Sequence, residues 1–147
     1  LDPAFPRTRR ELALQLLALG RMDEALAEAR KLAVIAPNNL PAMAVLGLCI
    51  GRAGDASEAR ALLKRLDGEK GKPFISSLEL ARIAAGLQDR DLTLQYLQRA
   101  VDAREGFLPL IGGDDEFAFL RDDARYQAIV RAIGVGTSRG ISITSGE

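Results

Sequence analysis

Few residues in this chain of 147 are of the types that carry out chemistry. Histidine is absent, which removes the most common general base, proton shuttle and metal ligand of proteins. The one cysteine, Cys49, lies between Leu48 and Ile50, where a thiol packs as a small apolar side chain. A single cysteine forms neither an internal disulfide nor a cysteine-based zinc site, and here it has no histidine base. We therefore interpret Cys49 as part of the core or of a groove wall.

An acidic cluster in the last third of the chain is a second candidate. Asp114, Asp115 and Glu116, with Asp122 and Asp123 close behind, could hold a cation or form an acid–base pair. Their spacing is not that of a calcium loop, whereas carboxylates at helix starts accept free backbone N–H groups and complement the helix dipole. We interpret these residues as helix caps.

The pair Gly112-Gly113 resembles a phosphate loop only superficially. No Lys-Ser/Thr follows it and no strand precedes it, so we interpret it as an ordinary loop. Taken together, these candidates predict a protein that is not an enzyme and that needs no cofactor and no metal.

The composition predicts an all-α protein. Alanine and leucine supply 23 residues each, against five Phe, two Tyr and no Trp, and both are strong helix formers. Twenty basic residues balance twenty acidic ones, which disfavours nucleic acid and anionic membrane surfaces as partners. No stretch approaches the roughly 20 apolar residues of a membrane-spanning helix. The length fits one domain.

A repeat of 34 residues organises the sequence. The matched positions are Leu12-Ala13, Leu46-Gly47 and Leu80-Ala81; Leu16, Ile50 and Ala84; Gly20, Gly54 and Gln88; and Ala25, Ala59 and Thr93. Each unit contains two amphipathic stretches separated by a short turn, and the small residues allow two helix backbones to approach closely. The predicted units are 6–39, 40–73 and 74–107. Pro3 and Pro37 are also 34 apart, so we expect residues 1–3 to end a preceding unit of a longer chain.

These residues resemble the tetratricopeptide repeat (TPR) family. The family pattern is matched by Leu-Ala or Leu-Gly on the first helix, by Gly-x-x-x-x-Ala leading into the second helix, and by a closing proline. The third unit departs from it, with Gln88, Thr93 and Glu105 in place of Gly, Ala and Pro. The resemblance implies a right-handed α-α superhelix of about three units, with a concave groove that binds peptides or helices of other proteins.

The segment after the third unit is predicted to close the stack. Tyr126, Ile129, Val130 and Ile133 form an apolar stripe that we expect to end at Gly134, so 114–134 is a capping segment and 135–147 a flexible tail. The run 117–126 is similar to the closing segment of TPR arrays in some bacterial multidomain regulators. This resemblance implies a docking arm of a larger bacterial signalling protein.

The resemblance also implies which side chains line the groove. They are Arg7, Arg10, Leu14 and Leu17 of the first unit, Ala44, Leu48 and Arg52 of the second, and Leu78, Arg82 and Ala85 of the third. Mixed apolar and guanidinium groups suit an amphipathic helix or extended peptide with a few acidic residues. We expect Leu14, Leu48 and Leu78 to make apolar contacts, and Arg10, Arg52 and Arg82 to bind carboxylates. The alternative is that these arginines form a solvated face whose stems cover the core.

The sequence therefore predicts a protein–protein interaction module whose partner is a protein, a peptide or another domain of its own chain. Two alternatives stay open. One is homo-oligomerisation through exposed helix faces or through the tail, which carries Ile141 and Ile143. The other is helical-repeat RNA binding, which the balanced charge disfavours. The missing signal sequence and the unpaired cysteine favour the cytoplasm.

Overall fold

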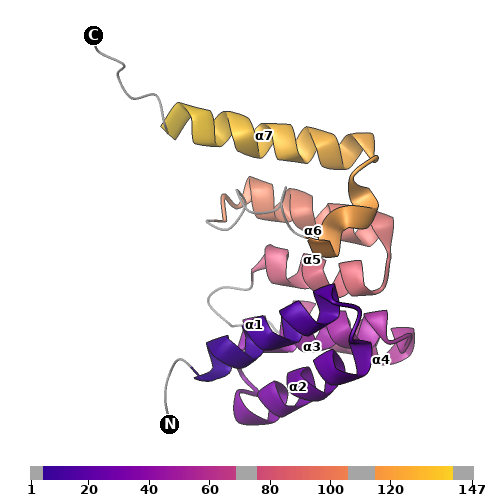
Figure 1. The fold of residues 1–147 in the computed structure, drawn as a ribbon. Coiled ribbons are helices and arrows are strands. Elements are labelled where there is room, and N and C mark those ends of the chain that lie inside the picture. The colour runs from indigo at the N-terminus through magenta and orange to yellow at the C-terminus, as the bar shows by residue number, and fades with distance from the viewer. Residues whose placement is uncertain (1–4, 69–75, 106–114, 141–147) are drawn as a thin grey trace.

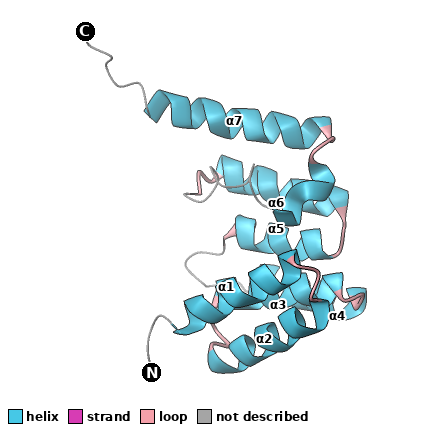
Figure 2. Ribbon diagram, viewed as in Figure 1, coloured by secondary structure: helices cyan, strands magenta, loops and turns pink. Residues whose placement is uncertain are grey.

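The all-α prediction is confirmed. A computed structural model describes residues 5–68, 76–105 and 115–140, and within these ranges it contains helices and turns but no strand (Figures 1 and 2). The elements are α1 (Phe5–Ala18), α2 (Met22–Ile35), α3 (Leu40–Arg52), α4 (Ala56–Asp67), α5 (Ser77–Gly86), α6 (Arg90–Asp102), the 3₁₀-helix η2 (Asp115–Leu120) and α7 (Ala124–Gly140). The first six helices form three consecutive hairpins, one in each predicted unit.

The turns of the hairpins share a left-handed residue at the repeated position. Gly20 and Gly54 have φ values of +75° and +98°, a conformation that glycine adopts without steric cost. Gln88 occupies the same place in the third hairpin with φ +54°. Its side-chain amide donates a hydrogen bond to the Ala85 carbonyl at 3.0 Å. The third unit therefore keeps the turn of the other two although its sequence departs from theirs.

Side chains at the helix starts cap four of these helices. Asn39, Asp55, Ser76 and Asp89 each accept a hydrogen bond from the backbone N–H three residues further on. Each cap satisfies an N–H group that has no partner within its own helix. These caps fix where α3, α4, α5 and α6 begin.

Small residues permit a close contact between α3 and α5. A Cβ atom added at Gly47 would lie 2.8 Å from side-chain atoms of Ile83. One added at Gly86 would lie 2.6 Å from the Leu48 carbonyl oxygen, and one at Gly51 would lie 2.6 Å from the carbonyl carbon of Gly86. The sequence repeat identified Gly47 as a packing position, whereas the contact between Gly51 and Gly86 was not predicted.

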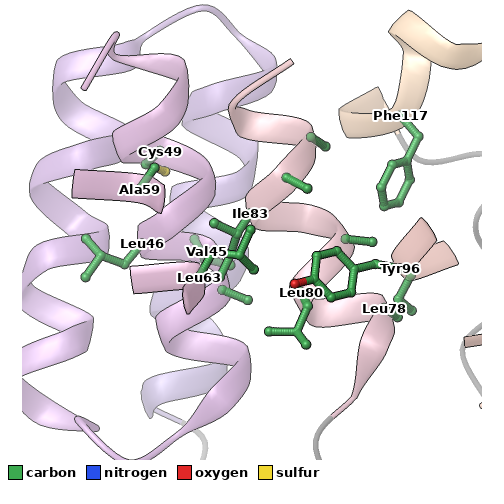
Figure 3. Close-up of a cluster of buried hydrophobic side chains, with 14 of the residues drawn as sticks. Val45, Leu46, Cys49, Ala59, Leu63, Leu78, Leu80, Ile83, Tyr96 and Phe117 are labelled. Carbon is green, nitrogen blue, oxygen red and sulfur yellow. The ribbon is translucent and has the colours of Figure 1, made fainter. Parts of the chain in front are cut away.

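Helix α3 lies at the centre of the three hairpins. It contacts α1, α2, α4 and α5, and residues 42–50 are all buried. Residues 40–51 include no charged side chain, which is typical of a helix covered on every side. Figure 3 shows Val45 of α3, Leu63 of α4 and Ile83 of α5 in this core. The two junctions between hairpins differ. Of the two helices in the preceding hairpin, α3 packs more on α2 than on α1, whereas α5 packs more on α3 than on α4.

The C-terminal elements η2 and α7 cover the third hairpin. Phe117 and Leu120 of η2 have no exposed surface, and Tyr126 and Ile129 of α7 are 5% exposed. In Figure 3, Phe117 points from η2 toward this hairpin. Asp123 caps α7 by accepting a hydrogen bond from the backbone N–H of Arg125 at 2.8 Å.

The predicted helix end at Gly134 is wrong. Gly134 keeps a helical backbone instead of the left-handed one that ends α1 and α3, so α7 continues through Gly140. Six residues that were assigned to a flexible tail, 135–140, are therefore helical. The remainder of the predicted tail, with Ile141 and Ile143, lies outside the described residues, as do residues 1–3, Gly112, Gly113 and Asp114.

Candidate partner-binding surface

The structure removes four of the ten predicted groove residues from any accessible surface. Ala44, Leu48 and Ala85 have no exposed area, and Leu78 is 1% exposed. The cause is the packing of α3, which is covered on all sides, and the close contact that α5 makes with it. A side chain without exposed surface contacts no partner in the folded chain. This corrects the expectation that Leu48 and Leu78 make apolar contacts to a partner.

Five predicted residues remain accessible and define what we call the candidate surface. Arg7 is exposed, and the other four are partly exposed. Four of them lie on α1 and one lies on the last turn of α3, a helix that contacts α1. The candidate surface consists of Arg7, Arg10, Leu14, Leu17 and Arg52.

Arg82, the tenth predicted residue, already binds two carboxylates of its own chain. Its Nη1 lies 3.0 Å from both carboxylate oxygens of Glu79, and its Nε donates to Glu116 of η2. Burial by itself would lower the pKa of Arg82, but the attraction of Glu116 and Glu79 outweighs it and raises that pKa. Arg82 therefore stays charged and holds η2 on α5.

Arg10 lies next to the cluster of charged side chains that Arg82, Glu79 and Glu116 form. Its Nη2 is 3.9 Å from Glu79, and its Nη1 donates to Glu11 at 3.2 Å. Charged side chains of α1 and α5 thus meet beside α3. The predicted anchors Arg10 and Arg82 are brought together here, and Glu79 is the residue that links them.

Arg52 differs from the other two predicted anchors. No carboxylate pairs with it among residues 5–68, 76–105 and 115–140, whereas its buried Nε lacks an acceptor as the Nε of Arg10 does. Its place on the last turn of α3 puts a positive charge near the negative end of the helix dipole. An approaching carboxylate could accept from this guanidinium group with a charge-assisted hydrogen bond.

Glu105 is a buried residue that the sequence analysis noted only as a departure from the family pattern. Its carboxylate accepts hydrogen bonds from Ser76 Oγ at 2.8 Å, from the Ser77 N–H at 2.7 Å and from the Leu78 N–H at 3.2 Å. It therefore joins the end of α6 to the start of α5, the helix that carries Glu79 and Arg82. An acidic residue in place of a repeated proline was the only signal for it.

The structure also shows where Cys49 and the acidic cluster of the sequence analysis lie. Cys49 has no exposed surface, and burial raises the pKa of its thiol to about 12, which places it in the core as an uncharged group. Glu116 of the acidic cluster pairs with Arg82 instead of capping a helix. Asp123 is a cap as expected, and hydrogen bonds from the Arg125 side chain and backbone lower its pKa.

The described part of the chain has neither a metal-binding cluster nor a membrane-spanning helix. No group of three potential metal-binding side chains gathers there. None of its helices combines the length and the apolar character needed to cross a bilayer. An open depression of about 600 Å³ separates α6 from α7 and is lined by Asp91, Leu94, Gln95, Gln98, Arg125, Ala128 and Ile129.

Comparison with known proteins finds no family model, no curated protein and no solved structure that matches the chain. The fold therefore defines the class: an all-α protein of three helical hairpins with a closing helix.

Proposed function

We propose that this chain is a protein–protein interaction module that binds an acidic peptide or helix at the candidate surface. The observation that carries the proposal is the state of Arg52, a partly exposed cation that has no carboxylate partner among the described residues. A carboxylate from a partner would balance this charge by pairing with the accessible part of the guanidinium group. Leu14 and Leu17 are only partly buried and offer apolar contact on α1, a helix that contacts α3.

The chemistry of the partner follows from the charges on this surface. Arg7, Arg10 and Arg52 are its ionisable members, and all three are basic. Arg10 lies 3.9 Å from Glu79 and donates to the exposed Glu11 at 3.2 Å, so another carboxylate would compete with weakly held partners. A segment with two or three acidic residues around one apolar residue fits this pattern.

The test is a selection of random 12-residue peptides on the immobilised full chain, followed by fluorescence anisotropy with the selected peptides. We expect enrichment of Asp and Glu next to Leu, Ile or Phe. Arg52→Gln should weaken binding about 10-fold or more, since a charge-assisted hydrogen bond contributes about 1.5–3 kcal/mol. The matched control is Arg60→Gln, which removes an exposed guanidinium of α4 that pairs with Asp89 and should leave binding unchanged.

Two results would contradict this function. One is a selection that enriches no acidic peptide. The other is a selected peptide that binds Arg52→Gln, Arg10→Gln and the unmodified chain with the same affinity. In that case the two arginines would interact with solvent or the helix dipole and not with the peptide.

The family and the wider setting belong to the same proposal. The repeated left-handed turns at Gly20, Gly54 and Gln88 support a TPR-type hairpin array. By the resemblance of its closing segment, we place this array in a bacterial signalling protein as its docking arm. The unpaired cysteine favours a cytoplasmic location.

A further inference from the structure

The short helix η2 lies where part of the partner-binding groove was predicted. Leu14, Leu48 and Arg82 occupy the same position of the three units, because they are 34 residues apart. Leu14 is partly exposed and belongs to the candidate surface. The side chain of Arg82 is only 12% exposed, and its Nε donates to Glu116 of η2. The groove position that is accessible on α1 is therefore occupied on α5 by a segment of the chain itself.

This segment has the chemistry that we propose for the partner. In η2 the carboxylate of Glu116 comes directly before the aromatic ring of Phe117. Glu116 pairs with the guanidinium group of Arg82, while Phe117 has no exposed surface and points toward the third hairpin (Figure 3). The contact between η2 and α5 thus shows how this chain holds an acidic side chain together with an apolar one.

The carboxylate of Glu116 also acts on the candidate surface. Burial is the main cause of the raised pKa of the Cys49 thiol on α3, but the charge of Arg52 opposes this rise and the charge of Glu116 adds to it. Arg52 and Glu116 are therefore both within electrostatic range of the same thiol. A partner carboxylate that pairs with Arg52 would be repelled by Glu116, since the two carry like charges.

Helix η2 is also an element that can leave its place while the rest of the fold stays intact. It has six residues in the 3₁₀ conformation, whose hydrogen bonds are poorer than those of an α-helix. Phe117 and Leu120 are its fully buried side chains, and Arg90 donates to its Phe119 carbonyl at 3.2 Å. Elements with few buried apolar contacts open at a lower free energy than the core. Helix α7 packs on α6, so its contact does not require η2.

We propose that η2 is an internal ligand of α5, and that a partner segment with the same acidic–aromatic pattern displaces it. The carboxylate of the partner then pairs with Arg82 in place of Glu116, and its aromatic ring replaces Phe117. Displacement of this kind rests on the proposed function and extends it, because the partner-binding surface then reaches from α1 to α5. A basic or purely aliphatic segment would leave η2 in place.

The first experiment measures the displacement of η2 by a synthetic peptide of residues 115–123, which carries the η2 sequence. The chain contains no tryptophan, so the indole emission of a Phe119→Trp chain reports on η2 alone. Phe119 is partly exposed and packs on the core, so its environment changes when η2 leaves. Between about 10 µM and 1 mM peptide, we expect the emission to shift to longer wavelength as the indole enters water. A control peptide with Glu116→Gln and Phe117→Ala should cause no shift.

The second experiment measures binding of the fluorescein-labelled 115–123 peptide by anisotropy. Its apparent affinity is its intrinsic affinity multiplied by the fraction of chains in which η2 is open. Glu116→Gln removes the carboxylate that pairs with Arg82, so this fraction and the apparent affinity should rise about 10-fold or more. Adding Arg82→Gln to this variant should remove the gain. The matched control is Glu58→Gln, which removes an exposed carboxylate of α4 and should bind the peptide as the unmodified chain does.

The two measurements distinguish the displacement of η2 from the proposed function. A peptide from the random selection that binds through Arg52 but leaves the Phe119→Trp emission unchanged would keep the proposed function and overturn the displacement. If the 115–123 peptide displaces η2 while no selected peptide depends on Arg52, α5 is an acidic–aromatic site and the assignment of Arg52 to the partner surface is wrong.

Three further results would overturn the displacement of η2. They are an unchanged emission at about 1 mM of the 115–123 peptide, a shift that the control peptide also produces, and equal affinity of the peptide for Glu116→Gln and the unmodified chain. Circular dichroism establishes that each variant is folded. If the chain with both Glu116→Gln and Arg82→Gln does not fold, the emission shift still decides, because Arg82 and Glu116 are intact in the Phe119→Trp chain.

Discussion

The carboxylate of Glu105 accepts a hydrogen bond from the backbone N–H of Ser77 at 2.7 Å, which joins the end of the third hairpin to its beginning. The same carboxylate also accepts from Ser76 Oγ and from the Leu78 N–H, so it satisfies two free N–H groups of α5. Glu105, which follows α6, thus caps the N-terminus of α5 and joins the two ends of the third hairpin.

Glu105→Ala should therefore lower the free energy of unfolding by about 2–3 kcal/mol, because it leaves buried donors without an acceptor. Glu105→Gln should cost less, since the amide oxygen still accepts hydrogen bonds. Urea denaturation followed by circular dichroism measures both changes. The control is Glu24→Ala, which removes an exposed partner of Arg21 and should change stability by less than about 0.5 kcal/mol. Equal losses for Glu105→Ala and Glu24→Ala would show that the cap contributes nothing.

Gln88→Gly should stabilise the chain by about 0.5–1 kcal/mol. Gln88 has a φ of +54°, and a side chain in the left-handed region costs about 1 kcal/mol that glycine avoids. The loss of its bond to the Ala85 carbonyl offsets part of this gain. The reciprocal change, Gly54→Gln, should destabilise by about 1 kcal/mol. Thermal melts measure both shifts, and a lower melting temperature for Gln88→Gly would mean that the Ala85 bond outweighs the strain.

Much of the fold could be predicted because the 34-residue period records packing that recurs within each hairpin and between successive hairpins. The small residues at Ala13, Gly47 and Ala81 and the turns at Gly20 and Gly54 follow from local geometry, and the structure places them as expected. The unit boundaries follow from the same signals.

The candidate surface could be predicted only in part. Helical register gives the direction of the Leu48 side chain but does not show that neighbouring helices cover it. The uncharged run of residues 40–51 was the signal for that burial. The pairing of Arg82 with Glu116 joins segments that are far apart in sequence, and no periodic pattern encodes it.

Leu48→Ala should lower the free energy of unfolding by about 3 kcal/mol, because it leaves a cavity in the core. Leu48→Arg should prevent folding, since nothing near this position accommodates a charge. Leu19→Ala is the matched control: the same atoms are removed from a side chain that is 71% exposed, and stability should change by less than about 0.5 kcal/mol. Similar melting curves for Leu48→Ala and Leu19→Ala would show that Leu48 lies on an accessible groove wall and not in the core.

Glu116→Gln should loosen η2 from α5. Arg82 and Glu116 are only 12% and 10% exposed, and the loss of one partner from such a pair costs about 3 kcal/mol. Hydrogen exchange should rise first at Phe117 and Leu120, which η2 buries, and less in α1 and α2. Glu58→Gln, which removes an exposed partner of Arg30, is the control and should leave exchange in η2 unchanged. Uniform exchange in Glu116→Gln would show that the packing of Phe117 alone holds η2.

The phenol of Tyr96 predicts a loss of stability at high pH. Burial, together with the 2.8 Å hydrogen bond that its O–H donates to Asp67, raises the pKa of Tyr96 to about 12. Since this value exceeds the pKa of about 10 in the unfolded chain, the contribution of Tyr96 is fully present below about pH 10 and is lost as the pH rises through about 12. In the Tyr126→Phe chain, Tyr96 is the only tyrosine, so ultraviolet absorbance of the phenolate reports its titration alone. The Tyr96→Phe chain should lack this part of the alkaline destabilisation, and a phenolate that forms near pH 10 in the folded Tyr126→Phe chain would contradict the role given to Asp67.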